Sequence, residues 1–267
     1  MNGLRIYSLR NAGVYVEAGG TGAMVDGLNK PTSHFDGVTD DDLASVMRND
    51  SFIENCSFLL YTHAHQDHFD VEKNIRYISD KKPEAVFLPF SEDVSYRRLS
   101  ECAVQNGTEL VSPVFGRDSG GVVRSGDVAL RFFAAGHTGS QFADTPHYCL
   151  LLETGGYSIF VSGDVDHMSS EWHPPVLRNH VDIAFVSPFF INQETGRDFI
   201  AEMSPEKLFV YHLPPEELDE FRMRKQAETD LIKYRRQLEK YGAELVSSPM
   251  ELIFEAEKRI QMKKCNV

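Results

Sequence analysis

The sequence has few cysteines and little positive charge. Its 267 residues carry 27 Lys and Arg against 40 Asp and Glu, which gives a formal net charge of −13 and a pI near 5.2. The 4 cysteines, Cys56, Cys102, Cys149 and Cys265, have no paired spacing, which argues against a disulfide framework and against a cysteine-based zinc module. A reducing compartment fits this usage.

The acidic balance also argues against nucleic-acid and anionic membrane partners, because both reward surfaces rich in Lys and Arg. The N-terminus has no sustained apolar segment, and no stretch approaches the roughly 20 apolar residues of a membrane span. We therefore expect a cytoplasmic protein with a single domain over residues 1–267, a small-molecule substrate, and neither a nucleic-acid nor a membrane partner. The sequence leaves the oligomeric state open.

Three imidazoles and a carboxylate are crowded into the six residues from His63 to His68. The preceding residues 57–61 form an apolar run short enough for a buried strand, so the cluster is expected on the loop at a strand's end. His63 and His65 project to the same side of an extended chain and can reach one cation, whereas Asp67 and His68 are carried past it to face a second. Neutral imidazole and carboxylate suit zinc-like ions; the alternative is a solvated polar loop.

This cluster resembles the His-x-His-x-Asp-His signature of the metallo-β-lactamase superfamily. In that family a third histidine completes the first metal site, a later aspartate bridges both metals, and a last histidine completes the second site. Candidates for all three follow apolar, β-rich runs here. The alternative is that the histidine and the aspartate stand in turns without binding a metal. The resemblance implies two divalent ions, with Zn²⁺ preferred and Mn or Fe compatible. The implied metal ligands are His63, His65, Asp67, His68, His137, Asp164 and His212.

Short apolar, β-rich runs bounded by turn residues predict strands, and apolar residues at helical spacing predict helices, in both halves of the chain. The expected strands are 5–8, 14–18, 23–26, 57–61, 85–88, 109–112, 128–134, 148–153, 158–162, 182–187, 208–211 and a final pair at 244–247 and 252–254. The expected helices are 40–47, 71–79, 91–105, 197–203 and one long amphipathic helix over 216–241. Two β-sheets packed face to face with helices outside, the α+β four-layer αββα sandwich of the metallo-β-lactamase family, would account for this mixture.

The resemblance implies a binuclear metal-dependent hydrolase. Two cations bridged by Asp164 would share a water whose pKa falls toward neutrality, and this metal-bridging hydroxide would cleave an ester, lactone or phosphodiester of a small molecule. Asp67 is the expected catalytic residue, because it would hold the second ion and orient the hydroxide. Among hydrolase branches, the chain resembles the one that includes ascorbate-6-phosphate lactonase. The oxygen-reducing di-iron branch has a glutamate where His65 stands here.

Two alternative functions stay open. In a persulfide dioxygenase, the same signature would hold one iron through His63, His137 and Asp164 and would leave Asp67 and His68 without a metal. The second alternative is a metal-dependent nuclease. A non-catalytic, metal-bound scaffold is the least favoured interpretation, because the ligand set is complete.

Several residues have undecided roles. Asp26 matches an aspartate that the family places behind the metal loop, where it can orient a ligand, but a turn former at a strand end is an equal alternative. The roles of Asp166 and His167 are open, and His34 is expected at the surface. Histidines without a surrounding motif are expected to be structural: His147, His173 and His180.

Overall fold

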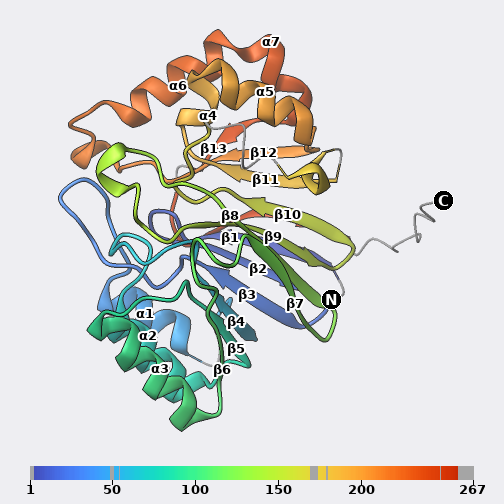
Figure 1. Ribbon diagram of the computed structural model, residues 1–267. Helices are drawn as coiled ribbons and strands as arrows, with labels where there is room; N and C mark the ends of the chain where they lie inside the picture. The colour runs from blue at the N-terminus through green and yellow to red at the C-terminus, as the bar shows by residue number, and fades with distance from the viewer. Residues whose placement is uncertain are drawn as a thin grey trace.

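The computed structural model describes residues 3–48, 51–53, 55–168, 174–178, 180–246 and 248–257, and within them the chain forms two mixed seven-stranded sheets packed face to face (Figure 1). The segment around Trp172, His173 and the basic tail from Lys258 to Lys264 lie outside the described residues. No helix in the described part of the chain is both long enough and apolar enough to cross a membrane.

The first sheet is built from the N-terminal part of the chain and closed by the last strand. Its strand order is β14-β1-β2-β3-β4-β5-β6. These strands span, in that order, Glu251–Ala256, Leu4–Ser8, Val14–Ala18, Thr21–Val25, Cys56–Leu60, Ala85–Phe87 and Glu109–Val111. The pairings are antiparallel from β14 to β3 and parallel from β3 to β6.

The second sheet repeats this arrangement with the order β13-β12-β11-β10-β9-β8-β7. Its strands span, in that order, Glu244–Leu245, Lys207–Val210, Ile183–Val186, Tyr157–Val161, Tyr148–Thr154, Val128–Ala134 and Gly120–Ser125. The pairings are antiparallel from β7 to β10 and parallel from β10 to β13. Strands β8, β10, β11 and β12 therefore run in one direction, and their carboxyl ends lie at the same edge of the sheet.

Three apolar clusters fill the three interfaces between the layers. One lies between the sheets, and the other two lie between each sheet and its helices. Alternate residues of one strand enter different clusters: Phe58 and Leu60 of β4 face the opposite sheet, whereas Leu59 packs beneath the helices. In β10, Ile159 faces inward and Phe160 faces the helices. Sheets buried on both faces explain why these strands read as continuous apolar runs.

The helices form the two outer layers (Figure 1). Those beside the first sheet are α1 (Asp40–Met47), α2 (Val71–Lys81) and α3 (Val94–Asn106). Those beside the second are α4 (Phe189–Asn192), α5 (Glu194–Met203), α6 (Met223–Lys233) and α7 (Arg235–Leu238). The αββα sandwich expected from the sequence is thus confirmed.

The expected long helix over 216–241 is wrong. The segment is divided into a short 3-10 turn at Glu216–Leu218, then α6, α7 and another 3-10 turn at Glu239–Tyr241. Arg222 has a left-handed backbone with φ of 55°, which stops a continuous helix from running through it. The preceding Phe221 is 73% exposed, and its ring lies 4.9 Å from that of His34, so it does not belong to the core-facing stripe.

The expected pairing of the last two strands is also wrong. Strand β13 joins β12 in the second sheet, whereas β14 pairs with β1 in the first. An apolar run identifies a strand but does not choose its partner, and here each of the two becomes the edge strand of a different sheet. Strand β7, which the sequence did not predict, is an exposed edge strand that begins with two glycines.

Candidate metal centre

The loop between β4 and α2 holds the clustered ligands at the carboxyl end of β4. The backbone N–H groups of His68 and Phe69 both donate to the carbonyl of His65, which folds the loop tightly. Asp70 ends the loop by capping α2, accepting from the N–H groups of Glu72 and Lys73 at 2.9 and 3.2 Å. The loop is therefore fixed at both ends by regular structure.

Three further ligand candidates come from the second sheet. His137 follows β8 and Asp164 follows β10, and a β-bridge between His137 and Val165 joins their loops. The Thr138 N–H donates to the Asp164 carbonyl at 2.8 Å, which holds the two loops together. His212 follows β12 and has a left-handed backbone with φ of 57°.

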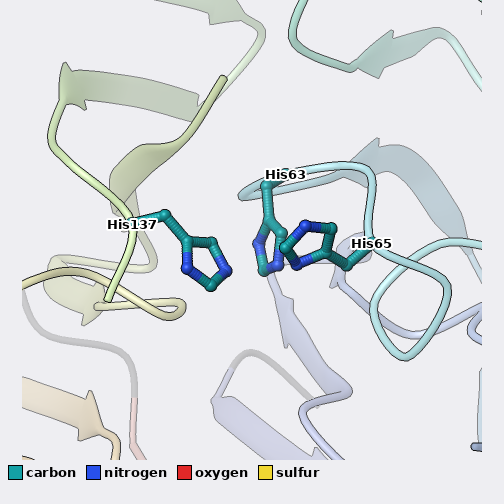
Figure 2. A group of neighbouring side chains, drawn as sticks. All are labelled: His63, His65 and His137. Atoms are coloured by element: carbon teal, nitrogen blue, oxygen red, sulfur yellow. The ribbon is translucent and has the colours of Figure 1, made fainter. Parts of the chain in front are cut away.

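All seven predicted ligands gather at one place, in overlapping groups whose donor atoms lie within 4.8 Å of one another. The first triad is His63, His65 and His137. Figure 2 shows His63 and His65 on one loop, with His137 facing them from another; the ring centroids of His137 lie 4.8 and 4.6 Å from those of His63 and His65. Three imidazoles converging on one point suit a zinc-like ion.

The second triad is Asp67, His68 and His212. The Nε2 atoms of His68 and His212 are 3.0 Å apart, and an Asp67 carboxylate oxygen lies 3.7 Å from the His212 Nε2. One carboxylate and two imidazoles are again a complete set of protein donors for a divalent ion.

Asp164 lies between the two triads. Its Oδ2 is 3.6 Å from Nε2 of His137 in the first triad and 3.6 Å from Nε2 of His68 in the second, and its Oδ1 is 3.3 Å from Nε2 of His212. One carboxylate thus reaches both triads from a single position.

The donor atoms themselves fit cations. The Nε2 atoms of His63 and His137 are buried and have no hydrogen-bond partner within the described structure. The Nδ1 of His137 lies 2.7 Å from the Thr138 carbonyl, an acceptor, so the proton must sit on Nδ1 and Nε2 is left with its lone pair. Buried lone pairs without donors cost free energy, and bound cations would satisfy them.

Asp26 orients one histidine of each triad. This fully buried carboxylate accepts from the Thr62 N–H at 2.9 Å and the Thr62 hydroxyl at 2.7 Å, and it lies 2.9 Å from Nδ1 of His68. The Thr62 hydroxyl, having donated to Asp26, can accept from Nδ1 of His63 at 3.0 Å. Asp26 also has φ of 48°, so it both makes the turn and holds Nε2 of His68 and His63 toward the centre.

The electrostatics favour positive charge where the triads meet. Burial, with nearby His68 adding to it, lowers the pKa of His63 well below its ordinary value, so this imidazole is neutral. Burial also opposes charge on His68, but Asp164 and Asp26 hold the pKa of His68 well above its ordinary value. Against burial again, His212 and His68 hold the pKa of Asp164 well below its ordinary value. The ionised Asp164 therefore attracts a cation.

His147, expected to be structural, supports the centre directly. It is fully buried, and its Nε2 accepts from the Asp164 N–H at 3.0 Å. Burial and nearby His137 lower its pKa to about 3, so it stays neutral and can accept. Gly163 has φ of 55°, and a Cβ there would lie 2.5 Å from that Nε2, so glycine is required for this approach. No motif surrounds His147, so local sequence gave no signal.

Two phenylalanines that the sequence did not single out lie against the triads. The Phe142 ring is 4.9 Å from that of His65 and 5.0 Å from that of His137. On the other side, the Phe35 ring meets His212 edge-on at 4.3 Å. Phe35 stands on a loop and Phe142 in the short 3-10 turn Ser140–Phe142, and neither segment is long enough for periodicity to carry a signal.

Asp166 and His167 belong to none of the metal-ligand groups found among the described residues. The Asp166 carboxylate accepts from the Met168 N–H at 3.0 Å, as a turn aspartate does. His167 is only 4% exposed, and its ring lies 5.2 Å from that of Phe190 in α4.

No family model and no curated protein matches this sequence. Solved structures, however, share its architecture over nearly the whole chain. The metallo-β-lactamase fold protein YhfI from Bacillus subtilis has a TM-score of 0.60 at 14% identity, over 96% of this chain and 100% of its own. A possible metal-dependent hydrolase from Veillonella parvula has a TM-score of 0.61 at 13% identity, over 95% of this chain and 99% of its own.

A third similar structure is a longer protein. CmlA, a diiron beta-hydroxylase from Streptomyces venezuelae, has a TM-score of 0.60 at 16% identity over 97% of this chain, which spans 54% of the length of CmlA. The three likenesses define the fold of this chain, which is the metallo-β-lactamase fold. The similar structures include a possible metal-dependent hydrolase and a diiron beta-hydroxylase.

Proposed function

We propose that the chain is a hydrolase that holds two divalent metal ions, Zn²⁺ by preference, and cleaves an ester, lactone or phosphodiester of a small molecule. The observation that carries this proposal is the position of Asp164, whose Oδ2 lies 3.6 Å from a donor nitrogen of each triad. A carboxylate that reaches two complete donor sets supports a pair of ions.

The triad of His63, His65 and His137 would hold the first ion, and Asp67, His68 and His212 the second, with Asp164 shared. Bound there, the ions would supply Lewis acidity and a nucleophile derived from water at neutral pH. The described site thus needs no serine or cysteine nucleophile.

The chain's own residues hold this centre and limit its access. Asp26 and Thr62 fix the ring nitrogens that face inward. Phe35 and Phe142 pack against the rings of His212 and His65. The side chains of Asp67 and Asp164 retain 16% and 18% exposure, whereas that of His68 is fully buried. We infer that a substrate reaches the centre from the side of these two carboxylates.

Chelation tests the proposal most directly. We expect the purified protein to hydrolyse a member of a panel of esters, lactones and phosphodiesters, to lose this activity when its metal is removed, and to regain it with Zn²⁺ or Mn²⁺. Including single-stranded RNA in the panel tests the nuclease alternative, which the acidic composition disfavours. Full hydrolysis by a protein shown by elemental analysis to be metal-free would contradict the proposal.

Asp67→Asn separates the hydrolase from the one-iron dioxygenase. The amide is nearly isosteric but a poorer ligand than carboxylate, so metal content should fall from about two ions per chain to about one, and hydrolysis should collapse with little change in fold. Elemental analysis, turnover and circular dichroism of wild type and variant measure this. A wild type that holds about one iron, consumes oxygen with a persulfide, and is indifferent to Asp67→Asn would instead support the dioxygenase.

A further inference from the structure

A cavity of about 340 Å³ opens beside the first triad, with His65 in its wall. It lies between the loop that follows β4, the loop that follows β5 and the segment at 141–146. A volume of this size fits a drug-sized molecule or part of one. Because it borders a candidate metal ligand, a group attached to the bond being cleaved can extend into it.

The lining of this cavity is aromatic and acidic. Phe90 and Phe142 stand in its wall, and each keeps 38% exposure, so part of each ring is open to a ligand. Asp93 and Asp144 supply two carboxylates, while no Lys or Arg is among the described residues that line it. Aromatic faces and carboxylates together recognise organic cations, because both present negative electrostatic potential.

The position of Phe142 ties the cavity to the metal centre. Its ring contacts His65 and His137 of the first triad, as described above, and also faces the cavity. Asp93 is held in place as the N-cap of α3, where it accepts from the Tyr96 N–H at 2.7 Å and the Ser91 hydroxyl at 2.6 Å. The negative charge is thus fixed in position before a ligand arrives.

We propose that this cavity binds a cationic group with an apolar or aromatic body, and that the substrate is an ester or lactone bearing an amine rather than a phosphodiester or other anion. The claim that the bound molecule is a substrate rests on the proposed function. The binding preference of the cavity does not depend on catalysis. An additional anionic group would face Asp93 and Asp144 without a compensating cation in the lining.

The preference is measurable with three probes of similar size: benzyltrimethylammonium, benzyl alcohol and benzenesulfonate. Binding is followed by chemical-shift changes or calorimetry with both metal-loaded and metal-free protein. We expect the ammonium probe to bind at least about tenfold more tightly than the sulfonate in both forms, with the alcohol between them. Equal or tighter binding of the sulfonate to the metal-free protein would overturn the inference and point to Lys30, which lines an adjoining hollow.

A charge-neutral double variant identifies the cavity as the binding place. Asp93→Asn with Asp144→Asn should remove most of the preference for the ammonium probe while leaving benzyl alcohol binding unchanged, and asparagine preserves the helix cap. The matched control is Asp127→Asn with Glu228→Gln, which removes the same charge from exposed positions outside the cavity lining. A preference that survives the first variant, or is lost equally in the control, would show that general surface charge is responsible.

The two proposals can fail separately. If the ammonium probe binds as expected but no ester or lactone is hydrolysed, the cavity inference stands and the reaction class falls. If esters are hydrolysed while the sulfonate binds as well as the ammonium probe, the hydrolase proposal stands and the cavity inference falls.

Discussion

The two sheets contribute to the metal centre in different ways. The first sheet presents four ligand candidates on one loop, between β4 and α2, whereas the second presents three on three separate loops, after β8, β10 and β12. The four are neighbours because the chain is continuous there. The three are neighbours because their strands run in the same direction, so that their carboxyl ends meet at one edge. The same kind of ligand can thus be placed by local sequence or by sheet topology.

The sheets nevertheless share one design. In each, antiparallel pairing changes to parallel pairing at a single strand, β3 in the first and β10 in the second. A buried or partly buried aspartate follows each of these strands: Asp26 after β3 and Asp164 after β10. The two carboxylates approach opposite nitrogens of His68, at 2.9 Å from Nδ1 and 3.6 Å from Nε2. Both carboxylates therefore lie just beyond the strand at which antiparallel pairing changes to parallel pairing.

The largest expected effect comes from removing the carboxylate of the second sheet. Asp164→Asn should reduce the metal content at both triads, because one change weakens the binding of both ions. Hydrolysis should fall to below about one-thousandth of the wild-type rate. Elemental analysis and turnover measure the two effects, with the exposed Asp127→Asn as a control. If the variant keeps both ions, Asp164 is not shared between the triads and the two-ion arrangement is wrong.

The equivalent change in the first sheet should act more weakly. Asp26→Asn keeps the volume and one acceptor but loses the charge that orients His68 and, through Thr62, His63. Metal affinity should fall about 10- to 100-fold while the number of ions at saturation stays the same. Competition with a chelator of known affinity gives the dissociation constants. If Asp26→Asn bound fewer ions at saturation, Asp26 would act as a metal ligand, as Asp164 does. It would then not act only by orienting the histidines.

The smallest expected effect concerns the backbone of Asp164. His147→Leu leaves the part-buried Asp164 N–H without its acceptor, which should cost about 1–3 kcal/mol of unfolding free energy. It should also weaken metal binding about tenfold. His147→Gln offers an amide oxygen and should recover a large part of both losses. Denaturant unfolding and chelator competition on the two variants decide this, and an equal loss in both would show that His147 matters through packing alone.

Much of the fold was predictable from local pattern. Strands β2 and β8 begin and end where their apolar runs predict, and helix α1 begins where its acidic residues predict. Each is buried or capped by residues that are visible in its own segment. Strand β7 was not predictable, since an exposed edge strand with two glycines has neither strong alternation nor an apolar run. The prediction of one continuous helix over 216–241 was wrong because the segment carries apolar residues at helical spacing. One of them, Phe221, packs against His34 on a loop and not on the sheet.

The metal-binding loop and the apolar runs that form the strands are determined by the sequence itself. Each of them lies within about ten adjacent residues. The tertiary structure decided the rest of the centre. His68 and His212 are 144 residues apart yet 3.0 Å from each other, and Asp26 reaches His68 across 42 residues of chain. The bond from the Asp164 N–H to His147 and the ring of Phe142 against His65 are contacts of the same kind. Such contacts depend on strand order and direction, which no short window of sequence encodes because pairing is chosen by the whole sheet.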